Sequence, residues 1–234
     1  MISVSAQPNQ SIIHGIICLQ TLAASPVPVG CRELARQVDL PVMTVNRILR
    51  TLMYMGMVVQ NEKKSYLPGP AIHVLAAQSI HGSELMNRAL PVIENYLPVN
   101  HIVSVGVLWG DKVSYLIHAL PEHSFSQSLL NNHLFDVTQS TIGVMLLSRM
   151  KDEEILQLLG NERFDEVKEP IDFARINGYA SRVHSSPQER TIAVMLDEKN
   201  HAAIALSRLH IRDENELEAS LKSLYELRDK IIGQ

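Results

Sequence analysis

The chain has 234 residues, of which 46% are hydrophobic and 20% charged, and its formal net charge is −4. This length suits one large domain or two ordinary ones, and the hydrophobic content excludes a largely disordered chain. No segment approaches the roughly eighteen consecutive apolar residues of a membrane span, and residues 1–7 lack the basic flank and apolar run of a signal peptide, so we expect a soluble cytoplasmic protein without a membrane contact.

The charge is unevenly divided along the chain. Residues 1–80 carry six Lys/Arg and three Asp/Glu, a net +3, and the remainder carries 15 Lys/Arg and 22 Asp/Glu, a net −7. A mildly basic N-terminal part on an acidic body favours a small nucleic-acid-binding module joined to a domain that avoids phosphate. The two cysteines, Cys18 and Cys31, have apolar neighbours and no CxxC spacing, so we expect small buried thiols.

The chain begins with a polar stretch, residues 1–10, that predicts a flexible tail. A helix is expected over 11–24, with Ser11 as its N-cap. The apolar residues that mark this helix are Ile13, Ile16, Ile17, Leu19 and Leu22. Pro26 and Pro28 end it and begin a loop.

Two short helices with the same apolar spacing follow. Apolar residues recur at i, i+3, i+4 and i+7, first at Cys31, Leu34, Ala35 and Val38, and then at Val45, Ile48, Leu49 and Leu52. Asp39-Leu40-Pro41 separates the two, and Gly56 is placed to end the second in a left-handed conformation. Strand-like residues 57–60 and 65–67 flank a polar turn. Together these elements predict a winged helix-turn-helix over 11–70.

The second of these helices has the two faces that reading a major groove requires. Its apolar face anchors it, and its other face carries short polar and arginine side chains for base edges and phosphates. Asn46 has the chemistry to address adenine, and Arg47 or Arg50 to address guanine or phosphate. The predicted DNA-contacting residues are Arg32, Arg36, Val42, Met43, Thr44, Asn46, Arg47, Arg50, Lys63 and Lys64.

Double-stranded DNA is therefore the expected partner, although a winged helix used for protein contacts or dimerisation would show a similar pattern. A net charge of only +3 is weak for a lone DNA-binding domain at physiological salt. The low charge favours a homodimer or homotetramer that places two DNA-binding domains on two half-sites of a palindromic operator.

C-terminal to the winged helix-turn-helix, residues 71–83 predict a linker helix and hinge, and residues 84–234 predict a second domain. Helices and strands are interleaved there without a βαβ rhythm, which predicts an α+β fold on an antiparallel sheet. The expected helices span 84–97, 138–150, 153–159 and 214–232, and the expected strand pairs are 102–109 with 112–119 and 191–196 with 202–209.

The sequence offers no signature of an enzyme. Its ten histidines are scattered without metal-ligand spacing. It has no G-x-S-x-G, G-x-G-x-x-G or P-loop motif. We expect no catalytic residues, no metal and no cofactor.

Residues 31–52 (CRELARQVDLPVMTVNRILRTL) resemble the helix-turn-helix of the IclR-type bacterial transcriptional regulators. Residues 56–69 resemble the C-terminal end of that domain, and the similarity is weaker over 81–234. The resemblance implies a regulator, often a repressor, that binds palindromic operators as a dimer or tetramer. It also implies that 84–234 form a GAF-like α+β effector-binding domain for a small metabolite, such as an organic acid from a catabolic pathway.

The resemblance further implies a set of effector-binding residues, which here departs from the family pattern. Gly143 is kept in the turn that opens a helix, but Val144 stands where the family usually has lysine. Arg182 stands where it often has an acid, and Thr191 where it often has cysteine. The implied effector-binding residues are Ser140, Thr141, Ile142, Gly143, Arg182, Thr191 and Ser207.

Two hypotheses follow from these departures. In the first, the pocket accepts a different ligand, with Arg182 or Arg190 pairing its carboxylate or phosphate. The protein is then an effector-controlled regulator of a catabolic or transport operon. In the second, the pocket has degenerated, and the protein is a winged-helix oligomerisation or protein-interaction protein.

Overall fold

The computed structural model describes residues 7–96, 101–121, 123, 134–184, 189–199 and 201–233. They divide into two compact units, one up to Ser83 and one from Glu84. The first part of the expected tail and the end of the expected 84–97 helix lie outside the described residues. None of the described helices is long and apolar enough to cross a membrane.

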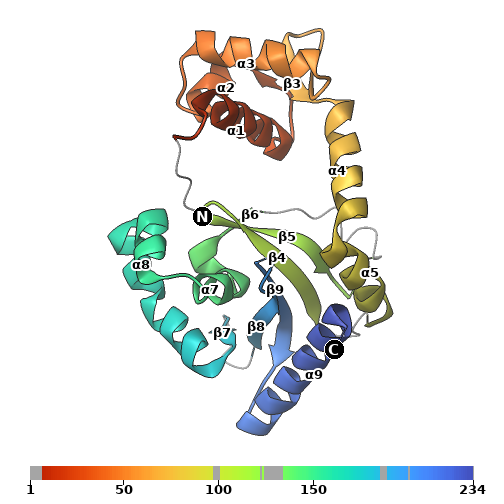
Figure 1. Ribbon diagram of the computed structural model, residues 1–234, viewed down its shortest axis with the longest axis vertical. Coiled ribbons are helices and arrows are strands. Elements are labelled where there is room, and N and C mark those ends of the chain that lie inside the picture. Colours follow the sequence, from red (N-terminus) through yellow and green to blue (C-terminus); the bar gives the residue numbers. More distant parts are fainter. Residues whose placement is uncertain are drawn as a thin grey trace. The chain divides into compact units, whose positions relative to one another are not determined.

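The first unit is a winged helix-turn-helix followed by a further helix (Figure 1). In chain order its elements are α1 (Gln10–Ala24), β1 (Val29–Gly30), α2 (Cys31–Gln37), α3 (Val42–Tyr54), β2 (Val58–Gln60), β3 (Ser65–Pro68) and α4 (Pro70–Gly82). The three strands form an antiparallel sheet in the order β1-β3-β2, in which the two-residue β1 was not predicted.

The core of the first unit lies between α1, α2, α3 and the wing. Leu34, Val45 and Leu49 are fully buried in it, as expected from the helical spacing, and so is Cys18, as expected from its apolar neighbours. Cys31 is only partly buried, so the expectation of two buried thiols holds for Cys18 alone.

The first helix corrects two predictions. Its N-cap is Asn9, whose side chain accepts hydrogen bonds from Ser11 N and Ile12 N, and Ser11 already lies inside the helix. The predicted apolar stripe is also wrong in part. Among the described residues of α1 only Cys18 and Leu22 are buried, whereas Ile16 and its isoleucine neighbours face solvent, because only a narrow strip of α1 meets the core.

The second unit is a six-stranded antiparallel sheet with helices on both faces, which confirms the predicted α+β class. Its helices are α5 (Glu84–Tyr96), the 3₁₀ turn η1 (Val137–Gln139), α7 (Thr141–Leu147), α8 (Asp152–Asn177) and α9 (Glu214–Ile232). Its strands are β4 (Ile102–Trp109), β5 (Lys112–Ala119), β6 (Leu134–Asp136), β7 (Ala180–Val183), β8 (Glu189–Asp197) and β9 (Ala202–His210), in the order β6-β5-β4-β9-β8-β7.

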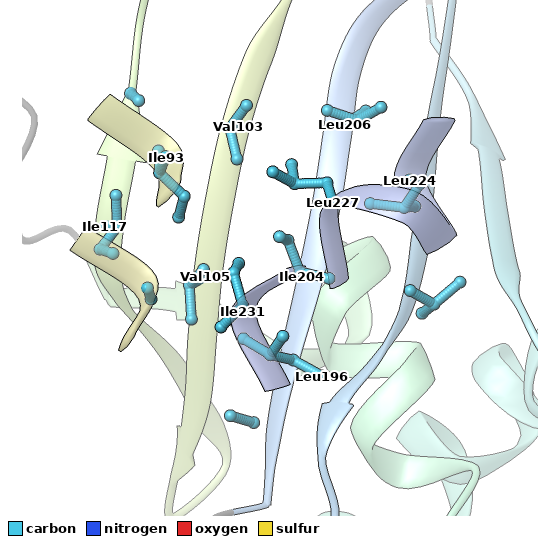
Figure 2. Packing of buried hydrophobic residues seen from close by; sticks show 14 of the residues in the cluster. Ile93, Val103, Val105, Ile117, Leu196, Ile204, Leu206, Leu224, Leu227 and Ile231 are labelled. Atoms are coloured by element: carbon cyan, nitrogen blue, oxygen red, sulfur yellow. The ribbon is translucent and has the colours of Figure 1, made fainter. Parts of the chain in front are cut away.

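Side chains alternate between the two faces of this sheet and build two cores. On one face α5 and α9 pack against the strands. Figure 2 shows Ile93 of α5 and Leu224, Leu227 and Ile231 of α9 over Val103 and other residues of the sheet. On the other face α7 and α8 cover a second cluster, in which every residue of α7 is buried.

Two helix predictions change in this unit, and one changes at the end of the first unit. The expected helix over 138–150 is η1 followed by the shorter α7, with Ser140 between them as N-cap. The expected helix over 153–159 is only the start of α8, which continues past a kink at Gly160 (φ 76°) to Asn177. The linker helix α4 runs through Gly82, so the residues expected to form the hinge are mostly helical.

Candidate nucleic-acid interface and effector site

Helix α3 presents one face to the core and the other to solvent. Val45 and Leu49 are fully buried, and they fix the helix against the rest of the unit. On the opposite face Met43 is 77% exposed, and Arg47 and Arg50 are also exposed. This division is the one that a groove-reading helix needs.

The turn between α2 and α3 has a left-handed residue. Asp39 adopts φ 51°, a conformation that aspartate tolerates better than most side chains. Leu40 N donates to Ala35 O (3.0 Å), and Val45 N donates to Pro41 O (3.1 Å), so the chain reverses within four residues. The tight turn sets α3 across α2 as in a helix-turn-helix.

The arginines of the winged helix-turn-helix differ in whether an acidic side chain already pairs with them. Arg32, Arg47 and Arg50 are exposed and form no ion pair with another described residue. Arg36 donates two hydrogen bonds to Glu33, from Nη2 (2.6 Å) and Nε (3.0 Å), and the Arg36 hydrogen bond lowers the pKa of the Glu33 carboxyl. Arg36 is therefore the least available of the four for a phosphate.

The tip of the wing carries two exposed lysines, Lys63 and Lys64. The Asn61 side chain accepts a hydrogen bond from Ser65 N (3.0 Å), and Lys64 N donates to Asn61 O (3.0 Å) with Lys64 at φ 58°. These bonds hold the turn closed and leave both ammonium groups in solvent, where a DNA backbone can meet them. The remaining predicted contact residues on α3 are Val42, which is exposed, and Thr44 and Asn46, which are half-buried.

In the second unit, three of the implied effector residues come from neighbouring strands. Arg182 of β7 pairs with Thr191 of β8, and Ile192 pairs with Leu206 of β9, which places Thr191 beside Ser207. By the alternation along β8 and β9, Thr191 and Ser207 share the face that α7 and α8 cover.

Arg182 is half-buried and forms no ion pair with another described residue. Its Nη2 donates to Thr138 O (2.5 Å) and its Nη1 to Gln139 Oε1 (3.2 Å), so it meets only neutral acceptors. Burial lowers the pKa of Arg182, and the nearby Tyr115 partly offsets this effect. An uncompensated guanidinium in such a position favours an anion.

Other polar groups surround Arg182. Tyr115 Oη and Ser140 Oγ lie 3.1 Å apart, and His184 Nε2 lies 2.7 Å from Thr191 Oγ1. Burial raises the pKa of Tyr115, while the hydrogen bond to Ser140 and the Arg182 charge offset part of that rise. We call Tyr115, Ser140, Arg182 and Thr191 the Arg182 cluster.

The remaining implied residues lie in the buried turn that opens α7. Ile142 is 1% exposed, and Thr141 is also buried. A Cβ on Gly143 would lie 2.1 Å from Val137 O, and Gly143 N is already taken by the Ser140 side chain (3.2 Å). Glycine is needed here for close approach of two backbone segments.

Residues 13–62 match the model of the IclR helix-turn-helix domain. The first unit thus contains an IclR-type helix-turn-helix domain. A search among curated proteins gave no match.

Solved structures of IclR-type regulators share the fold of this chain. The regulator from Brucella abortus has a TM-score of 0.73 at 17% identity, covering 97% of this chain and 93% of its own. A regulator from Silicibacter has a TM-score of 0.74 at 17% identity, covering 94% and 96%. An IclR homolog from Microbacterium hydrocarbonoxydans, complexed with 4-hydroxybenzoate, has a TM-score of 0.66 at 18% identity, covering 96% and 100%. These likenesses show that the chain shares the fold of IclR-type regulators.

One member of the Arg182 cluster and three of its contacts were not predicted. Tyr115 lies in a predicted strand, but nothing in its spacing marked it as polar lining. Thr138, Gln139 and His184 bond to the cluster from η1 and from the end of β7, neither of which the sequence predicted as such. In this IclR-type chain, no group of three or more His, Cys, Asp or Glu among the described residues is arranged to hold a metal ion.

Proposed function

We propose that this IclR-type regulator is a repressor of a catabolic or transport operon, and that it binds a palindromic operator through α3 and the wing. The observation that carries the DNA contact is the outer face of α3, with its exposed arginines that pair with no acid. A helix anchored by buried Val45 and Leu49 holds these side chains in fixed positions, which base recognition requires.

The proposal includes a homodimer or a tetramer built from dimers, supported by apolar surface on the first unit. Ile12 is 63% exposed, and Ile16 is 45% exposed, both on α1. Helix α4 has no buried residue, although it carries Val74 and Leu75, each at least half exposed. A short helix without tertiary packing is marginal in water, so α4 favours a second copy as its partner.

We further propose that a small organic carboxylate binds at the Arg182 cluster and controls DNA binding. Arg182 supplies a half-buried positive charge without an acidic partner, and Tyr115 and Thr191 supply hydroxyl groups beside it. The relative that holds 4-hydroxybenzoate shares the fold, and this ligand is an example of the proposed class.

Selection of bound fragments from random-sequence DNA tests the DNA proposal directly. The full-length protein is used at a low and a high salt concentration. We expect an enriched two-fold-symmetric site whose binding weakens steeply as salt rises. Salt-sensitive binding without an enriched site would reduce the function to non-specific binding. No binding at either salt would overturn the proposal and favour a protein-interaction role.

Single arginine variants test the role of α3 on the selected site. Arg47→Ala or Arg50→Ala is expected to weaken operator binding by about 1–3 kcal/mol if the arginine reads a base, with relaxed preference at one position. The matched control is Arg36→Ala, which removes a guanidinium already paired with Glu33 and should cost clearly less. Titration of labelled DNA measures the affinity of each variant. Equal losses of operator affinity for Arg36→Ala and Arg47→Ala would contradict this assignment.

A further inference from the structure

A second site lies at the start of α9, outside the Arg182 cluster. It is a cavity of about 290 Å³, lined by Arg190, Ile211, Arg212, Asp213, Glu214 and Leu217. Ile211 and Leu217 belong to the core under α5 and α9, whereas Thr191 lies on the face covered by α7 and α8. The cavity therefore belongs to the other face of the sheet, and Arg190 does not join Arg182.

Arg190 is the unusual lining residue. Its Nε atom is buried and has no hydrogen-bond partner, and its side chain forms no ion pair with another described residue. A guanidinium left in this state costs free energy unless an acceptor reaches it. Arg212, by contrast, is satisfied, because Nε donates to Glu216 (3.0 Å) and Nη2 pairs with the same carboxylate.

Two carboxylates line the same cavity without pairing with Arg190. Asp213 caps α9 by accepting from Glu216 N (2.9 Å) through Oδ1. Glu214 forms no ion pair with another described residue. Burial raises the pKa of Tyr179, while the nearby Arg190 charge lowers it and the Glu214 charge raises it. Positive and negative groups thus lie on the walls of one cavity but do not touch each other.

The rest of the lining is apolar. Ile211 is 4% exposed, and Leu217 packs against the same core. The volume lies near the small end of ligand pockets, which span about 300–1,000 Å³, so it suits one small metabolite and not a nucleotide. A ligand that fits this cavity has to pair with a guanidinium and with a carboxylate, and it also has to contact an apolar surface.

We propose that this cavity binds a free α-amino acid with an apolar side chain. Its carboxylate pairs with Arg190, its ammonium group with Glu214 or Asp213, and its side chain contacts Ile211 and Leu217. A simple carboxylate would leave the acids unpaired, and a simple amine would leave Arg190 unpaired. The zwitterion is the small ligand that meets both charges, and this site is independent of the proposed effector site.

Thermal unfolding of the full-length protein with each proteinogenic L-amino acid in turn tests the proposal. At least one apolar amino acid at millimolar concentration should raise Tm, because a ligand that binds only the folded state stabilises it. For leucine, the matched probes are 4-methylpentanoate, which lacks the amino group, and isoamylamine, which lacks the carboxyl group. Both should bind more weakly than leucine. No rise in Tm with any amino acid would overturn the proposal.

Two variants separate this site from the Arg182 cluster. Arg190→Gln should weaken amino-acid binding about tenfold or more, since it removes a charged hydrogen-bonding partner. Arg182→Gln should leave that affinity unchanged. If Arg182→Gln abolishes binding while Arg190→Gln retains it, the amino acid occupies the other site and the proposal is wrong. Circular dichroism of both variants checks that they fold, and Glu214→Gln gives a second test from the acidic wall.

Discussion

Gly143, which the family resemblance marks as an effector-binding residue, also has a packing role in the turn that opens α7. Its amide bonds to Ser140, and a Cβ at this position would lie only 2.1 Å from Val137 O. Such a contact cannot be relieved by a side-chain rotation, because the obstructing atom belongs to the backbone. The turn that opens α7 therefore tolerates glycine and resists any larger residue.

Gly143→Ala is accordingly expected to lower the free energy of unfolding by about 1–3 kcal/mol, the usual cost of overpacking. Gly15→Ala is the control, because nothing lies within 4 Å of a Cβ there and the residue lies inside α1. That change should be neutral or stabilising by up to about 1 kcal/mol. Chemical denaturation followed by circular dichroism measures both. A Gly143→Ala protein as stable as the parent would show that the backbone can move away.

At the scale of elements, ion pairs fasten the middle of α8 to the sheet. Arg163 Nη2 donates to both Asp136 oxygens (2.8 and 2.9 Å) and Nη1 to Asp111 (2.8 Å), while Lys112 Nζ donates to Asp136 (2.8 Å). Burial raises the pKa of Asp136, but the hydrogen bonds from Lys112, Thr138 and Arg163 outweigh it and hold the pKa well below its ordinary value. These groups are about one-third exposed, so solvent screens their attraction.

A lowered carboxyl pKa makes stability depend on pH in one direction. Asp136 contributes its full stabilisation above its unfolded pKa of about 3.9, and loses it as the pH falls through the lower folded pKa. Asp136→Asn should therefore reduce stability at neutral pH and reduce the loss on acidification below about pH 4. Urea unfolding across this range measures both. An Asn variant with the same acid dependence as the parent would contradict the assignment.

The elements that the sequence predicted well have a strong local pattern. The 102–109 and 112–119 strands are eight-residue runs that contain several β-branched and aromatic residues, and Gly110 between them adopts φ 59° as a tight turn requires. The missed strands β1, β6 and β7 have two to four residues, too few for alternation to appear. These short strands form because an adjacent strand offers hydrogen bonds. That pairing depends on the tertiary structure and leaves no local pattern in the sequence. Arg182, Ser140 and Thr191 were singled out, but Tyr115, Thr138 and Gln139 were not, because the sheet and η1 bring these residues to Arg182 from distant parts of the chain.

The whole molecule depends on self-association in the proposed function. Ile16→Glu places a charge on the exposed face of α1, where a second copy is proposed to pack. We expect weaker dimerisation, measured by light scattering, and weaker operator binding, since one head alone carries little positive charge. Val27→Glu is the control, because Val27 is 64% exposed in a loop. Equal behaviour of the two variants would mean that α1 does not form the interface.

The proposed effector control is likewise a property of the whole chain. If a small carboxylate releases the protein from its operator, Arg182→Gln should retain DNA binding and lose the response to that carboxylate, since the variant keeps α3 intact. Titration of labelled operator in the presence of 4-hydroxybenzoate and related benzoates measures the response. An Arg182→Gln protein that still responds with unchanged sensitivity would place the effector elsewhere.

The strand order also decides when each unit can form during synthesis. At the centre of the large sheet, β4 (Ile102–Trp109) pairs with β9 (Ala202–His210), and α9 still has to cover that face. The winged helix-turn-helix, by contrast, is complete before Ser83. The head can therefore fold on the ribosome while the sheet waits for almost the last residues, since distant pairings form slowly. Under the proposed function, a translation product that stops before β9 would carry a complete winged helix-turn-helix on a chain unable to build its effector-binding domain. No effector could then control its DNA binding.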